Sequence, residues 1–209
     1  MFTSIAAGIL LSQNKALQEN PVNSLVDIIK YLLLVQSLDT LNYTRDLYSS
    51  LLTVVLVALL SPVTGIIMII LGAPAASLFA ETFLCAACFT IIAVQPMLAR
   101  YGLDGTLWSR AFTLGLPVSD AYGGFIGGII GSWIGAIPIA LDWDRPWQQW
   151  PITVAYGGAI GALLGHIMGF IVSLQSNDKY GLIKYEKELK AAEKTANQKT
   201  TTQSPTARH

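Results

Sequence analysis

The chain has 209 residues, of which 53% are hydrophobic and 12% are charged, and its formal net charge is zero. Soluble domains typically carry about 25% charged residues, so this chain has too few charges to cover a water-exposed surface. Its mean hydropathy of +0.52 favours a membrane protein. The composition excludes an intrinsically disordered chain and a nucleic-acid-binding protein that depends on a basic face.

Five stretches are long and apolar enough to be considered as membrane-spanning helices, because a hydrocarbon core about 30 Å thick needs about 20 mostly apolar residues. These stretches are residues 22–41, 47–71, 79–99, 121–141 and 152–174. The first contains Asp27 and Lys30, which can pair on one helix face, and the second contains Pro62, a candidate kink. We therefore expect an all-α, multi-pass transmembrane bundle of five to six helices over residues 1–177.

The two ends of the chain differ from this bundle. Residues 1–11 are too short to span a membrane and lack the basic region and cleavage site of a removable signal peptide. Residues 178–209 hold seven basic and four acidic residues, and we expect a charged tail that is partly disordered. The positive-inside rule places this tail in the cytosol. Alternating spans then place residues 100–120 in the cytosol, and residues 72–78 and 142–151 in the lumen.

A repeat with an offset of 34 residues relates the last two spans, since Ala-Tyr-Gly-Gly begins at Ala121 and again at Ala155. Each span then carries a glycine at every fourth position: Gly123, Gly127, Gly131 and Gly135 in one, and Gly157, Gly161, Gly165 and Gly169 in the other. A step of four residues places these glycines on one helix face, and small residues let helices in lipid approach closely. We expect the two spans to pack as an antiparallel pair. A lipid-accommodating groove is the alternative.

The loop between these spans combines tryptophans, acidic residues and an arginine. They are Asp142, Trp143, Asp144, Arg145, Trp147 and Trp150. Indole rings favour the membrane interface, and arginine can pair bidentately with a carboxylate or a phosphate. We predict an interfacial turn that contacts a partner protein or lipid. A metal site at the Asp-x-Asp pair is disfavoured, because two carboxylates rarely make a complete site.

Residues 131–152, GSWIGAIPIALDWDRPWQQWPI, resemble the PIG-F family. The resemblance rests on the pattern G-x-W-x-G-A-x-P-I-x-L-D-W-D-R-P-W-Q-x-W-P-I. A shorter block supports it, with Gly-Ala-Pro at 72–74 followed by Glu-Thr-Phe-Leu at 81–84. The chain departs from the family at Ala140, where a proline is usual, and in a first span that looks cut short.

The resemblance implies a non-catalytic, multi-pass subunit of the endoplasmic-reticulum membrane, with no cofactor or metal of its own. Members of the family stabilise ethanolamine phosphate transferases of glycosylphosphatidylinositol (GPI) anchor biosynthesis. Their partners are large catalytic subunits that move ethanolamine phosphate from phosphatidylethanolamine to mannose of the GPI precursor. Membrane lipid is an expected contact and nucleic acid is not. The alternatives are an intrinsic transferase that uses Asp142 and Asp144, or a small lipid transporter built on the 34-residue repeat.

Four further residues have a chemical and a structural interpretation. Glu81, at the luminal start of a span, is a candidate contact for a partner or a lipid headgroup, although an acid also suits a helix N-terminus. Cys85 and Cys88 have redox spacing but lie in an apolar span, so we expect buried small hydrophobes. For His166 we expect a hydrogen bond to a neighbouring helix rather than a proton relay.

Overall fold

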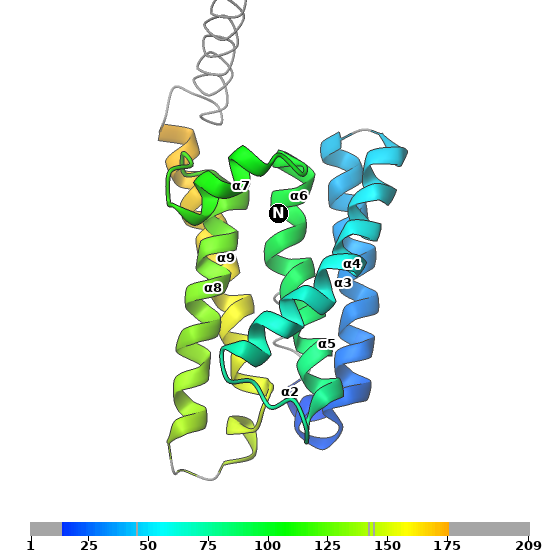
Figure 1. The fold of residues 1–209 in the computed structure, drawn as a ribbon, viewed down its shortest axis with the longest axis vertical. Helices are drawn as coiled ribbons and strands as arrows, with labels where there is room; N and C mark the ends of the chain where they lie inside the picture. Colours follow the sequence, from blue (N-terminus) through cyan, green and yellow to red (C-terminus); the bar gives the residue numbers. More distant parts are fainter. Residues whose placement is uncertain (1–13, 45, 142, 144, 176–209) are drawn as a thin grey trace, which may run out of the picture.

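The computed structural model describes residues 14–44, 46–141, 143 and 145–175, and every regular element within them is a helix. The all-α class expected from the sequence is confirmed (Figure 1). The longer helices are α3 (Pro21–Thr44), α4 (Leu47–Ile70), α5 (Phe79–Phe89), α8 (Asp120–Ala136) and α9 (Ile152–Gln175). The shorter ones are α2 (Asn14–Glu19), α6 (Gln95–Tyr101), α7 (Gly105–Phe112), a π-helical turn (Thr90–Val94) and two 3₁₀ turns (Ile137–Ala140 and Pro146–Gln148). The expectations for residues 1–11 and 178–209 lie outside the described residues.

Four segments are long and apolar enough to cross a membrane: Leu47–Ile70, Phe79–Tyr101, Asp120–Ala140 and Ile152–Leu174. They correspond to the last four spans expected from the sequence. Helix α3, which covers the first expected span, has 24 residues, but it is not among the segments that are both long enough and apolar enough to cross a membrane. Its Lys30 Nζ donates a hydrogen bond to Asp27 Oδ1 at 2.9 Å, so the expected pairing of these two exposed charges is present.

The connecting segments alternate between the two ends of the bundle (Figure 1). The segments that follow α4 and α8 lie at the lower end of the view, whereas α7 and the connections on either side of it lie at the upper end. This order agrees with the alternation expected for residues 72–78, 100–120 and 142–151.

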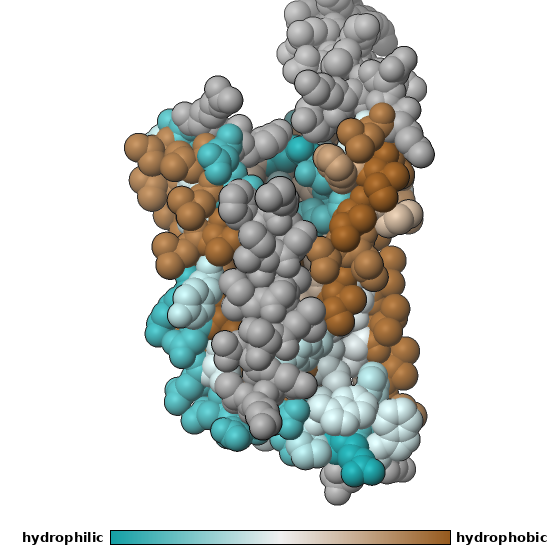
Figure 2. All heavy atoms as spheres, turned by 180° about the vertical axis from the view of Figure 1, so that it is seen from behind, coloured by the Kyte–Doolittle hydropathy of each residue, from teal (hydrophilic) through white to brown (hydrophobic). Residues whose placement is uncertain are grey.

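The surface and the interior match a helix bundle in lipid. Half of the residues of α4 are exposed, including Leu59, Ile66 and Ile70, and Figure 2 shows apolar surface along much of the bundle's length. The interior contains Cys85 and Cys88, which are both buried and free. The expectation that these cysteines act as small buried hydrophobes is therefore confirmed by their position.

A π-helical turn joins α5 to α6 and is stabilised from α3. Gln36 Nε2 of α3 donates a hydrogen bond to the backbone carbonyl of Ile91, within this turn, at 3.1 Å. A polar backbone group at membrane depth needs such a partner, because lipid supplies none. The contact therefore fixes α3 against the middle of the α5–α6 segment. One turn later in α3, the hydroxyl of Thr40 donates a hydrogen bond to the backbone carbonyl of Gln36.

Candidate functional site: a tryptophan turn on a glycine-packed helix pair

Helices α8 and α9 make the most extensive helix contact in the described part of the chain. All eight glycines of the two series lie in this contact. A Cβ atom added to Gly127 would lie less than 3.0 Å from the Gly161 carbonyl oxygen, and one added to Gly161 would lie equally close to the Gly127 carbonyl oxygen. Real Cβ atoms essentially never come so close to another atom, so any larger residue forces the helices apart.

The glycine contact extends along the full length of the helix pair. At one end, a Cβ atom at Gly169 would meet the backbone of Ser119, and at the other end a Cβ atom at Gly135 would meet the backbone of Thr153. Since backbone meets backbone along this line, no space remains for a lipid chain between the two faces. The glycine faces cover each other, so a surface for another protein has to lie elsewhere on the chain.

The segment that joins α8 to α9 is organised by a single buried side chain, that of Gln148. We call residues 141–151 the tryptophan turn. Gln148 Nε2 donates hydrogen bonds to the carbonyl oxygens of Pro138, at 2.6 Å, and Leu141, at 2.9 Å. Its Oε1 accepts a hydrogen bond from the Arg145 backbone N–H at 2.8 Å. One glutamine therefore satisfies three backbone groups and holds the turn against the end of α8. Our sequence analysis did not single out Gln148, although it lies within the matched block.

Trp150 ties the tryptophan turn to the other connection at the same end of the bundle. Its Nε1 donates a hydrogen bond to Thr82 Oγ1 at 3.0 Å. The Thr82 hydroxyl is fully buried and lies within hydrogen-bond distance of the carbonyl oxygens of Pro74 (2.8 Å) and Leu78 (2.9 Å). The two sequence blocks that carried the family resemblance therefore meet in space. Thr82 is a second residue that the sequence analysis missed, although it lies in the shorter block.

Two indole rings of the turn remain exposed. Trp143 is 57% exposed and Trp147 is 38% exposed, and their ring centroids lie 6.0 Å apart. The Arg145 side chain between them in sequence is also exposed. Gln148 holds the backbone of Leu141 and Arg145, and Trp150 holds the end of the turn against Thr82, so the rings and the arginine lie next to anchored backbone positions. This geometry suits recognition of another surface.

The acidic candidates are only partly described. Asp142 and Asp144 lie outside the described residues, so the geometry of the Asp-x-Asp pair is not defined. Glu81 lies in the first turn of α5, half-buried and next to Thr82 in sequence. Glu81 therefore lies at the same end of the bundle as the tryptophan turn. Among the described residues, no group of three or more His, Cys, Asp or Glu side chains could hold a metal ion.

His166 lies away from this turn, in the interior between helices. Its ring contacts the face of α8 at Gly124, where an added Cβ would overlap the imidazole. Its Nε2 is buried and has no hydrogen-bond partner among the described residues. The sequence predicts a hydrogen bond from His166 to a neighbouring helix. Nε2 forms none with the described residues, but the imidazole has a hydrogen-bonding contact with the backbone of Ile92, in the π-helical turn.

Comparison with known proteins agrees with these sequence blocks. The GPI biosynthesis protein family Pig-F matches residues 1–170. The chain is 38% identical over 109 residues to "Glycosylphosphatidylinositol anchor biosynthesis protein 11" of Neurospora crassa, which covers 52% of this chain and 40% of that protein. It is 39% identical over 107 residues to the protein of the same name in Yarrowia lipolytica, covering 51% and 48%.

A human relative carries a more specific name. The chain is 37% identical over 91 residues to the Homo sapiens "GPI ethanolamine phosphate transferase, stabilizing subunit", covering 42% of each chain. The chain thus spans less than half the length of these curated relatives. No solved structure matches it.

Proposed function

The chain belongs to the GPI biosynthesis protein family Pig-F, and we propose that it is a non-catalytic subunit of the endoplasmic-reticulum membrane that stabilises GPI ethanolamine phosphate transferases. Its partners are the large catalytic subunits that add ethanolamine phosphate to mannose of the GPI precursor. The name of the human relative supports this role. The apolar, all-helical fold supports a site of action within a membrane.

The observation that carries the proposal is the contrast between the anchored backbone and the exposed rings of the tryptophan turn. The side chains of Gln148 and Trp150 form hydrogen bonds within the chain. The exposed indoles of Trp143 and Trp147 form none with the described residues. Tryptophan and arginine are enriched among the residues that dominate binding energy at protein interfaces. An anchored segment also loses little conformational freedom on binding. The catalytic subunit therefore docks on the tryptophan turn, with the glycine-packed pair as its support.

The test is co-purification of the catalytic subunits from microsomes with the tagged full chain. A double variant, Trp143→Ala with Trp147→Ala, should reduce the co-purified transferase by at least tenfold, which corresponds to about 1.4 kcal/mol of binding free energy. Trp133→Ala is the matched control, because Trp133 lies on α8 and is 57% exposed, as Trp143 is. Its substitution should leave co-purification unchanged.

Two results would contradict the proposal. If the double variant retains its partner as well as the control does, docking does not use these rings. If the purified chain transfers ethanolamine phosphate without any partner, the chain is itself an enzyme. Gel filtration of each variant in detergent shows whether the fold is retained.

A further inference from the structure

A polar cavity lies at the end of the bundle opposite the tryptophan turn, where α3, α6 and α8 meet. Its volume is about 140 Å³, several times the share of one water molecule in the liquid, about 30 Å³. Its lining consists of Gln36, Asp39, Thr40, Pro96, Ala99, Arg100, Asp120 and Ala121. Three of these eight residues are charged, and each of the three comes from a different helix. In a chain with 12% charged residues, this concentration of charge needs an explanation.

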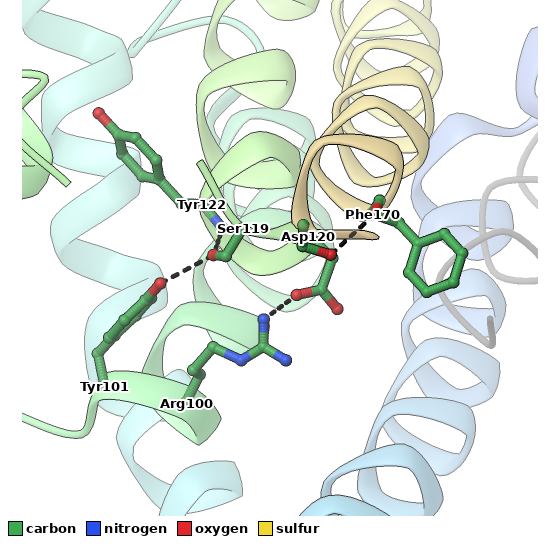
Figure 3. A network of polar contacts seen from close by, with 7 residues as sticks. Arg100, Tyr101, Ser119, Asp120, Tyr122 and Phe170 are labelled. Atoms are coloured by element: carbon green, nitrogen blue, oxygen red, sulfur yellow. Dashed lines mark hydrogen bonds and ion pairs between the residues drawn. The ribbon is translucent and has the colours of Figure 1, made fainter. Parts of the chain in front are cut away.

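The charges of the cavity do not balance. Arg100 of α6 forms an ion pair with Asp120 of α8 (Figure 3), and the arginine side chain is only 7% exposed. Asp39 of α3 adds a second carboxylate, which forms no ion pair with any residue in the described part of the chain. Among the eight lining residues, two carboxylates therefore accompany one guanidinium, and the imidazole of His166 lies within electrostatic range of both Asp39 and Arg100. Asp39 is the lining carboxylate with which a cationic ligand can pair.

The Arg100–Asp120 side of the cavity is held in place by neighbouring hydrogen bonds (Figure 3). The hydroxyls of Tyr101 and Ser119 lie 2.8 Å apart, and Ser119 Oγ accepts the backbone N–H of Tyr122 at 3.2 Å, as the N-cap of α8. These bonds fix the end of α6 to the start of α8. The position of the ion pair is therefore set by the fold before any ligand binds.

A buried hydrogen-bond acceptor lies behind the cavity wall. Gln95 is fully buried, and its Nε2 donates to Oγ1 of the cavity-lining Thr40 at 3.4 Å. Its Oε1 accepts no hydrogen bond from the described residues. An unpaired acceptor is costly in a low-dielectric interior. Gln95 does not itself line the cavity, so the oxygens available to a ligand are those of the lining residues. A carboxylate without a donor suits a ligand that brings N–H groups, and a primary ammonium has three donors and no acceptor.

The cavity lies at the level of the helix ends, where lipid headgroups are found. Asp120 is the first residue of α8, and Arg100 is next to the last residue of α6. Asp39 is five residues from the end of α3 at Thr44, about 8 Å along a helix that rises 1.5 Å per residue. We propose that this cavity binds the ammonium group of a phospholipid headgroup, with Asp39 as the carboxylate that pairs with it. This site lies at the opposite end from the docking turn and is independent of the proposed function.

The experiment measures which lipids stay with the purified full chain in detergent, using native mass spectrometry. Phosphatidylethanolamine should be retained in preference to phosphatidylglycerol, which lacks an ammonium group. Asp39→Asn removes the charge with almost no change in shape and should lower the retained phosphatidylethanolamine by roughly tenfold. Asp27→Asn is the matched control, because Asp27 is also on α3 but pairs with Lys30 at the surface. It should retain the lipid as the unsubstituted chain does.

Several outcomes would overturn the proposal. Equal retention of phosphatidylethanolamine by Asp39→Asn and Asp27→Asn would show that Asp39 does not bind the headgroup. Equal retention of phosphatidylglycerol would show that no ammonium is recognised. If Asp39→Asn loses the catalytic subunit but keeps its lipid, Asp39 pairs with a basic side chain of that partner. Unchanged gel filtration of Asp39→Asn excludes misfolding as the cause.

Discussion

Replacement of Gly161 by alanine tests the helix contact that supports the candidate site. The added Cβ would lie 2.8 Å from Gly131 Cα, whereas ordinary contact begins at 3.4 Å. Both partners are backbone atoms in helices, so the helices have to separate locally by at least the difference, 3.4 − 2.8 = 0.6 Å. A gap of about 0.5–1 Å forfeits a quarter to a half of the dispersion energy of the atoms involved. Overpacking of this kind typically costs about 1–3 kcal/mol.

Two opposing effects decide whether Gly161→Ala raises or lowers the free energy of unfolding. Alanine is favoured over glycine in a helix by about 1 kcal/mol in water, so a clash-free site would become more stable. In lipid, the helix pair depends on close packing rather than on the hydrophobic effect, so we expect the clash to exceed this gain. The free energy of unfolding in detergent should fall by up to about 2 kcal/mol.

The matched control for this measurement is Gly105→Ala. Gly105 is helical, but a Cβ atom added there would meet nothing within 4 Å, so the variant should be as stable as the unsubstituted chain or slightly more. Reversible denaturation in mixed micelles measures both variants. If Gly161→Ala is as stable as Gly105→Ala, the backbones of α8 and α9 do not touch, and the account of the glycine faces is wrong.

Two further predictions concern hydrogen bonds at the helix ends. Trp150→Phe keeps an aromatic ring but removes the donor to Thr82, so the free energy of unfolding should fall by about 1 kcal/mol. Adding Thr82→Val should cost less in this background than alone, and strictly additive losses would refute the bond. At the start of α7, hydrogen bonds from the Thr106 hydroxyl and then from its backbone N–H hold the pKa of Asp104 below the usual 3.8. A depressed carboxyl pKa stabilises the folded state above the unfolded value, and this contribution is lost as the pH falls through the folded value. The protection of the Thr106 amide from hydrogen exchange, relative to its intrinsic rate at the same pH, should therefore fall below about pH 4. Asp104→Asn should remove that dependence, and the same fall in the variant would exclude Asp104 as its cause.

The sequence identified the parts of this protein whose physics is local. Membrane thickness fixes the length of an apolar helix, so the spans were predictable within a few residues. The glycines recur every four positions, and a helix places them on one face whatever lies opposite. The tryptophan-rich block was also visible in the sequence, because indole rings gather at membrane interfaces and the pattern is long.

Only the tertiary structure decided which of these parts meet. Trp150 and Thr82 are 68 residues apart. No sequence periodicity links an indole in one connecting segment to a hydroxyl in the helix that follows another connecting segment. The same holds for Asp39, Arg100 and Asp120. Asp39 lies in an expected span, whereas Arg100 and Asp120 lie at the two ends of the connecting segment expected at residues 100–120 and belong to helices α6 and α8 in the structure. Local propensity sets a helix and its faces, but contacts between distant segments depend on how the helices pack. Sequence alone therefore supplied the helices and the glycine faces. Helix packing decided that those faces are used within the chain and that Trp143 and Trp147 stay exposed.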